Sequence, residues 1–186
     1  MESTHKSNSY LQAQKESEII EAFLNSPLYN KEKETNISQS RSIEEGGKIK
    51  MQFDLFLKKS KIIGEVYVTE LPFNPGRKRK FMNDILKMLT FEKFMQNQKI
   101  NSTKHYEKYY FLTASEEQLK GLDPKWEDEK FIKHSRDNSL IGKDTWLNTM
   151  LEEFEVTVYY YCLNDTFWKD LKETRAMQKD GMAGKK

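Results

Sequence analysis

The chain has 186 residues, a length that suits one folded domain with a small extension. Its net charge is only +2, so no overall field points to nucleic acid, and a nucleic-acid surface would have to be local. A lone cysteine excludes an internal disulfide, and we find neither an apolar signal segment nor a run of about 20 apolar residues, so we expect a cytoplasmic protein without membrane spans.

Apolar spacing predicts a first helix over residues 8–25, which ends just before Pro27. The polar stretch 32–47 is typical of a loop, with one short strand near residues 36–43. Residues 48–57 and 61–69 predict two strands joined as a hairpin. Asn74 as helix cap and Pro75 as first helical residue then open a long helix that reaches about residue 98.

In the second half of the chain, residues 105–113 predict another strand, and Ser115 caps a short helix. Residues 121–143 show no periodicity and are interpreted as a loop. A helix over residues 144–153, a strand over 155–162, a helix over 165–178 and a disordered tail over 179–186 complete the chain. With 11 Phe and 9 Tyr, aromatic side chains must supply most of the core, and we expect Trp146, Trp168 and the three consecutive tyrosines at 159–161 to be buried in it.

This order of elements predicts a single α/β domain over residues 1–178. The hairpin must be antiparallel, whereas the helical crossover after it favours a parallel return, so the sheet should be mixed.

The hairpin places two acids together. If the turn centres on Lys59 and Ser60, or if the loop has four residues, the register pairs Asp54 directly with Glu65. A three-residue loop would instead put them on opposite faces. Cross-strand partners have Cβ atoms about 4.5–5.5 Å apart, and like charges there destabilise a sheet.

The repulsion between these acids must be offset. A divalent cation would do so, because Mg²⁺ prefers one or two carboxylates plus waters and a phosphate. The alternatives are a protonated acid or a neighbouring lysine at a solvated edge. The strands around the acids are otherwise apolar, and buried carboxylates are rare unless paired or coordinated, which favours the metal.

A second signal is the basic run Arg77, Lys78, Arg79 and Lys80 in the first turn of the long helix. Positive charges at the start of a helix interact unfavourably with the helix dipole, and a bound phosphate would supply the negative charge that the dipole favours. The alternative is a solvated basic turn.

Other kinds of active site find little support in the sequence. The three histidines are too scattered for a zinc site, and no P-loop or nucleophile elbow occurs.

The run from Phe53 to Leu57 and the run from Lys61 to Tyr67 resemble the core of the PD-(D/E)xK nuclease superfamily, the restriction-endonuclease-like fold. The predicted order of helix, three strands, helix and strand also resembles its core, over about residues 8–113, with 114–178 as a C-terminal extension. The resemblance implies that Asp54 and Glu65 bind Mg²⁺, or Mn²⁺ in its place, and that a lysine two residues after the glutamate orients the attacking water.

This sequence has Tyr67 where the resemblance calls for lysine. Some members of the superfamily carry this lysine on the following helix. In this chain Lys80 and Lys87 lie there, on the same helix face as Asp84. The alternative is that the three residues form an ordinary ion-pair ladder on a solvated face. A glutamate of the first helix, Glu21 or Glu18, would be the accessory metal ligand.

The leading hypothesis is therefore a Mg²⁺-dependent nuclease acting on DNA, with Arg77, Lys78 and Arg79 on phosphate. Its competitor is a non-catalytic relative that binds nucleic acid or a protein partner. The sequence leaves open whether the protein forms a homodimer.

Overall fold

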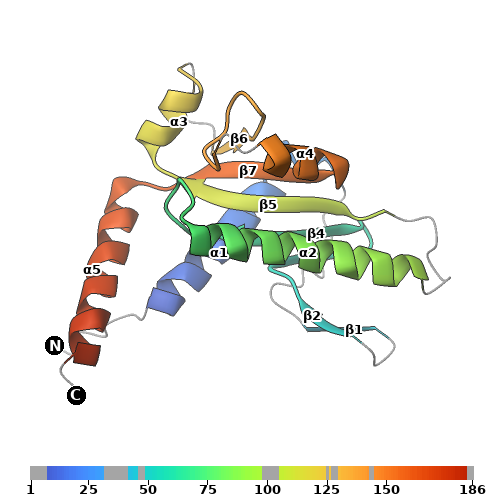
Figure 1. Cartoon of the computed structure of the whole chain (residues 1–186), viewed down its shortest axis with the longest axis horizontal. Helices are drawn as coiled ribbons and strands as arrows, with labels where there is room; N and C mark the ends of the chain where they lie inside the picture. Colours follow the sequence, from blue (N-terminus) through green and yellow to red (C-terminus); the bar gives the residue numbers. More distant parts are fainter. Residues whose placement is uncertain are drawn as a thin grey trace.

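The computed structural model describes residues 8–31, 42–45, 49–97, 105–124, 126, 130–142 and 145–183. Within them the fold is mixed α/β, as predicted (Figure 1). The helices are α1 (Asn8–Leu24), α2 (Pro75–Asn97), α3 (Glu116–Leu122), α4 (Thr145–Glu153) and α5 (Asp165–Ala183). The strands are β1 (Ser42–Glu45), β2 (Ile49–Gln52), β3 (Leu55–Leu57), β4 (Ile62–Tyr67), β5 (Glu107–Ala114), β6 (Phe131–Lys133) and β7 (Val156–Cys162).

The main sheet has the strand order β3-β4-β5-β7-β6. Strands β4, β5 and β7 run parallel, because helices connect them, whereas β3 and β6 pair antiparallel at the two edges. The predicted mixture of strand directions is therefore confirmed. Strands β1 and β2 form a separate antiparallel pair that projects from the main sheet (Figure 1).

Helices cover both faces of the main sheet, so the fold has three layers. Helix α2 crosses the near face in Figure 1, where buried residues of α2, α3 and α4 pack on alternate residues of the strands. Helices α1 and α5 pack against the opposite face. Because side chains alternate along a strand, β4, β5 and β7 contribute to both layers of core.

Aromatic side chains fill much of the core, as the composition predicts. Phe23 of α1 is fully buried, and its ring lies 5.0–6.3 Å from the rings of five other aromatic residues on the sheet and in the loop after α1. Tyr159, Tyr160 and Tyr161 are all buried, as is Trp168.

Helix α2 begins where its capping residues predict. The side-chain oxygen of Asn74 accepts a 2.9 Å hydrogen bond from the backbone N–H of Arg77, and Pro75 is the first helical residue. Phe81, Ile85 and Met88 then face the sheet. Lys80, Asp84 and Lys87 border this apolar stripe along one side. The residue at which α2 begins and the face that it buries therefore determine where the candidate lysines lie.

Several predicted boundaries are wrong. The single strand predicted over residues 48–57 is broken into β2 and β3, and the predicted loop 121–143 contains the short strand β6. Helix α5 continues to Ala183, into the segment predicted as a tail, of which residues 184–186 lie outside the described residues. Residues 36–41 of the predicted early strand also lie outside them, and β1 begins at Ser42.

None of the helices in the described part of the chain is both long and apolar enough to cross a bilayer.

Candidate functional site

The β3–β4 hairpin has the predicted register. Leu57 pairs with Ile62 and Leu55 with Gly64, and the strands are joined by the four residues 58–61. Lys61 closes the loop with a positive φ of 58°. The even loop length therefore brings Asp54 and Glu65 to the same end of the hairpin.

Asp54 does not pair with Glu65 in the β3–β4 ladder, in contrast to the prediction. It lies one residue before β3, in the break after β2, and its Oδ2 accepts a 2.8 Å hydrogen bond from the backbone N–H of Val66. The preceding Phe53 is fully buried against Phe91, with ring centroids 5.2 Å apart. Burial of Phe53 thus fixes the break, and the hydrogen bond holds the Asp54 carboxylate beside the residue that follows Glu65.

Glu65 is a buried carboxyl on the α2 face of the sheet, only 3% exposed. Nζ of Lys87 lies 2.5 Å from its Oε1 and donates a 2.9 Å hydrogen bond to the Gln52 carbonyl. The Oε1 atom has no hydrogen bond of regular geometry, so its contact with Lys87 is an ion pair. Burial, followed by the nearby charge of Asp54, raises the pKa of Glu65 to about 8, although Lys87 opposes the shift.

Asp54 is perturbed in the same direction. Burial raises the pKa of its carboxyl above the ordinary value, against the Val66 hydrogen bond and the charges of Lys87 and Lys80, which lower it. In both acids burial outweighs the neighbouring lysines, so the site favours the protonated form of these carboxyls.

Lys80, Asp84 and Lys87 share one face of α2, as their spacing predicts; Lys87 contacts Glu65, whereas Lys80 forms the ion pair with Asp84 that the alternative expects. Lys80 lies 2.6 Å from Asp84, and its ammonium is 4.5 Å from the centroid of the Tyr67 ring. Asp84 also accepts a 2.8 Å hydrogen bond from the hydroxyl of the buried Tyr110. Burial lowers the pKa of Lys80, but Asp84, Glu65 and Asp54 outweigh it and raise the pKa overall, so Lys80 stays an ammonium ion.

The first helix contributes a carboxyl that the sequence did not identify. Burial, then the charge of Asp54, raises the pKa of Glu16 to about 7, against the opposing charge of Lys80. Glu16 therefore interacts electrostatically with Asp54 and Lys80 from α1. The sequence contains one indication of this role. Glu16 lies three and four residues before the buried Ile19 and Ile20, on the same side of α1, and an acid on an apolar stripe needs a partner.

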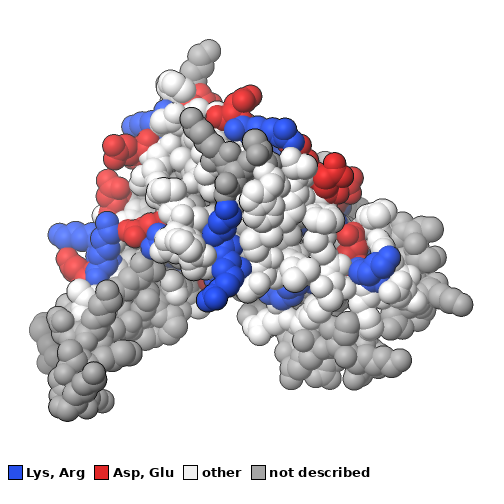
Figure 2. Space-filling view, viewed as in Figure 1, with Lys and Arg blue, Asp and Glu red and all other residues white. Residues whose placement is uncertain are grey.

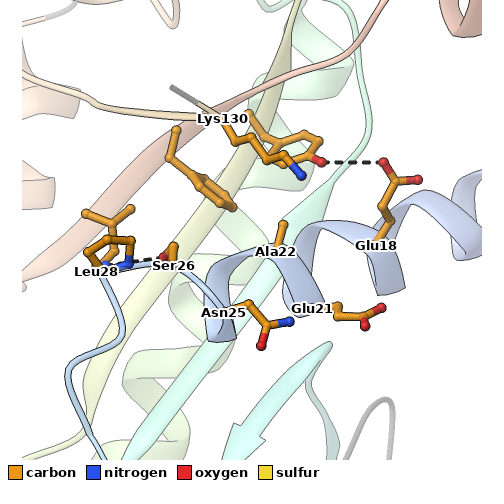
Figure 3. A pocket seen from close by; sticks show the side chains of 10 residues that line it. Glu18, Glu21, Ala22, Asn25, Ser26, Leu28 and Lys130 are labelled. Atoms are coloured by element: carbon orange, nitrogen blue, oxygen red, sulfur yellow. Dashed lines mark hydrogen bonds between the residues drawn. The ribbon is translucent and has the colours of Figure 1, made fainter. Parts of the chain in front are cut away.

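The structure places Glu21 and Glu18 elsewhere. Both line a cavity of about 670 Å³ together with Lys130, Phe131 and Tyr161 (Figure 3). Five residues separate Glu16 from Glu21, which at 100° per residue turns Glu21 about 140° away around the helix. Glu21 is thus not brought to Asp54 and Glu65, and the expectation that it joins them is wrong; the acid of α1 whose charge interacts with Asp54 is Glu16.

The four residues of the basic run point in different directions. Arg77 donates a 2.8 Å hydrogen bond to the Glu70 carbonyl, Lys78 lies over the ring of Trp146, and Arg79 is exposed. Only Lys80 turns toward the acids. Lysine and arginine nevertheless form a continuous strip of positive surface over the start of α2 (Figure 2).

Among the described residues, no three His, Cys, Asp or Glu side chains gather closely enough to enclose a metal ion by themselves. The site consists of the buried carboxyl of Glu65 and the partly buried carboxyl of Asp54, with Lys87 in contact with Glu65 and Lys80 paired with Asp84 beside them. Comparison of the chain with protein-family models, with curated proteins and with solved structures finds no match, so the chemistry must be argued from these groups alone.

Proposed function

We propose that this protein is a Mg²⁺-dependent nuclease that cleaves DNA phosphodiesters at the site of Asp54 and Glu65. One observation carries the proposal: two carboxyls, both buried enough that their pKa values are raised, are held at the same end of the β3–β4 hairpin and face lysines of α2. Like charges in a desolvated site are costly unless a cation joins them.

The donor set fits a hard divalent ion. Asp54 and Glu65 would supply carboxylate oxygens, and the charge of Glu16 on α1 is felt at Asp54. Oε1 of Glu65 is buried without a regular hydrogen bond and has Lys87 as its ion-pair partner, so a metal would replace that ammonium as the counter-charge. Mg²⁺ takes one or two carboxylates and completes its coordination with water and phosphate, so a full cage of protein ligands is unnecessary.

A bound Mg²⁺ would polarise the phosphodiester and supply a water of lowered pKa. The chain's own contribution is positive charge around the phosphate. Lys80 keeps its proton and lies over Tyr67, the position at which the nuclease resemblance calls for lysine. It would therefore donate hydrogen bonds to the phosphate oxygens and stabilise charge that develops there. Lys87 would move from Glu65 to the same role when the acids bind metal.

The arrangement of elements supports the restriction-endonuclease-like core that the resemblance implies. Helix α1 precedes the β3–β4 hairpin, α2 follows it, and β5 returns parallel to β4. The β1–β2 pair, which stands apart from the main sheet, departs from the expectation of three consecutive strands in one sheet.

The second candidate function is a binding module that retains the fold without catalysis. The Lys87–Glu65 ion pair favours it, because an ammonium 2.5 Å from Oε1 already neutralises part of the charge that a metal would offset. Metal binding separates the two candidates, since the nuclease requires it.

The test combines calorimetry with Mg²⁺ and Mn²⁺ and a plasmid-cleavage assay on the same samples. Asp54→Ala and Glu65→Ala should abolish metal binding and cleavage. Glu116→Ala, which removes an exposed carboxyl paired with Lys120, is the matched control and should change neither. Lys80→Ala should retain metal binding but lower the cleavage rate about 10²-fold or more.

Metal binding without cleavage in the wild type would favour the binding module. Failure of the wild type to bind either metal, with DNA present, would overturn the nuclease.

A further inference from the structure

Trp146 is a large aromatic side chain exposed on the surface. The sequence predicted it in the core, but 53% of it is accessible. The reason lies in the phase of α4: Leu147 and Leu151, one turn apart, occupy the stripe that faces the core, and both are buried. Trp146 is one position off that stripe, on the flank of α4.

A cation accompanies this indole. Nζ of Lys78, in the first turn of α2, lies 5.4 Å from the centroid of the Trp146 ring. The pair therefore joins the start of α4 to the start of α2. A base stacked on the indole would have its attached phosphate beside an ammonium group, and this combination of ring and cation characterises surfaces that hold unpaired bases.

The basic turn connects this pair to the candidate site. At 100° per residue, Lys80 lies on one flank of α2, Lys78 on the other, and Arg79 on the outer side between them. Arg79 is exposed, with no ion-pair partner among the described residues, and the strip of positive charge in Figure 2 runs over this turn. A helix with its side chains is about 10–12 Å wide, so a strand that crosses it spans only a few nucleotides.

We propose that Trp146 and Lys78 form a stacking site for an unpaired base, and that the nucleic acid bound here is single-stranded and crosses the first turn of α2. The position of the scissile phosphate rests on the proposed function, whereas the stacking site does not. In a duplex the faces of the bases are covered by their neighbours, so an isolated indole can stack only on a base that is out of the helix. Lys78 and Arg79 contact phosphates, which both forms of DNA present.

The proposal is tested by measuring oligonucleotide binding in the absence of metal. Labelled oligothymidylate and a hairpin duplex are titrated in EDTA against the wild type, Trp146→Ala and Trp146→Phe, with fluorescence anisotropy as the readout. Phe154→Ala is the matched control, because Phe154 is 45% exposed just beyond the far end of α4. Thermal melting of each variant confirms that it folds.

We expect Trp146→Ala to weaken binding of the single strand by about fivefold or more, since stacking contributes roughly 1–3 kcal/mol per base. Trp146→Phe retains an aromatic ring and should lose less, and Phe154→Ala should lose nothing. Binding of the duplex should be unchanged in all three. Oligothymidylate should also quench tryptophan fluorescence in the wild type and not in Trp146→Phe, where Trp126 and Trp168 remain.

Equal loss of single-strand and duplex binding, or no loss of either, would overturn the stacking site and leave Trp146 as a contact between α2 and α4. A wild type that binds no oligonucleotide would overturn it as well. The proposed nuclease is judged separately by metal binding and plasmid cleavage. A Trp146→Ala variant without effect would not contradict the proposed nuclease, and a failure to bind metal would not contradict the stacking site.

Discussion

At the scale of single residues, the charge balance around Glu65 is the most consequential feature. Folding takes this carboxyl from water to a position where Lys87 neutralises it only in part, and the pKa values of Asp54 and Glu16 are raised as well. Three acids with raised pKa values in one site make the protein resist their ionisation. Stability without metal must therefore depend on pH.

Stability of the metal-free protein should fall as the pH rises from about 5 to about 8. The pKa of Glu65 is 4.5 when unfolded and about 8 when folded, so within this window the folded state holds a proton that the unfolded state releases. Each proton released on unfolding makes unfolding easier as the pH increases. Thermal melting in EDTA across this range measures the slope.

Glu65→Gln should flatten that slope and raise the melting temperature at pH 8, because the amide cannot ionise. Glu116→Gln, at an exposed ion pair, should leave the slope as it is. A wild-type melting temperature that rises with pH over the window would contradict the burial of these acids.

At the scale of elements, the β3–β4 hairpin presents the acids, and its geometry depends on a close approach at Gly64. This residue pairs with Leu55, and a Cβ atom added to it would come within 3.1 Å of the backbone oxygen of Tyr109 on β5. A backbone oxygen inside the sheet cannot move aside as a flexible side chain would. The spacing of β3, β4 and β5 therefore requires glycine here.

Gly64→Ala should lower the free energy of unfolding by about 1–3 kcal/mol, because the added methyl group overpacks the sheet. Gly121→Ala is the matched control. No atom lies within 4 Å of the Cβ that it would add, and the site is helical, so it should raise stability by about 0.4–1 kcal/mol. Urea denaturation of both variants measures the difference. Equal effects would show that Gly64 is not packed as described.

At the scale of the whole molecule, one sheet supports two cores. Phe23 of α1 and Phe81 of α2 are fully buried on opposite faces of the sheet. The central strands contribute alternate side chains to each core, so neither face can lose its packing without exposing the sheet that supports the other. The molecule should therefore unfold as one cooperative unit.

Phe23→Ala and Phe81→Ala should each destabilise the protein by about 3–5 kcal/mol and shift a single calorimetric transition by on the order of 10 °C. The cost arises from lost burial and from the cavity left behind. Two resolved transitions, with each substitution moving only one of them, would contradict a shared core.

Features that depend on near neighbours in the chain could be predicted from the amino-acid sequence. The cap at Asn74 and Pro75 defines where α2 begins, and the many Phe and Tyr residues define the composition of the core, whereas the hairpin register was predicted only for an even loop such as the 58–61 loop found here. Caps, loop length and composition act through local geometry, so a sequence states them directly.

Which side of each helix or strand is covered by another layer depends on packing in three dimensions and could not be predicted. The predicted strand is broken at Asp54, where the preceding Phe53 packs on Phe91, and Glu16 rather than Glu21 interacts electrostatically with Asp54. Trp146 also stays on the surface, and the three residues of β6 pair with β7. Each outcome follows from packing between segments far apart in sequence, which no periodicity within one segment encodes.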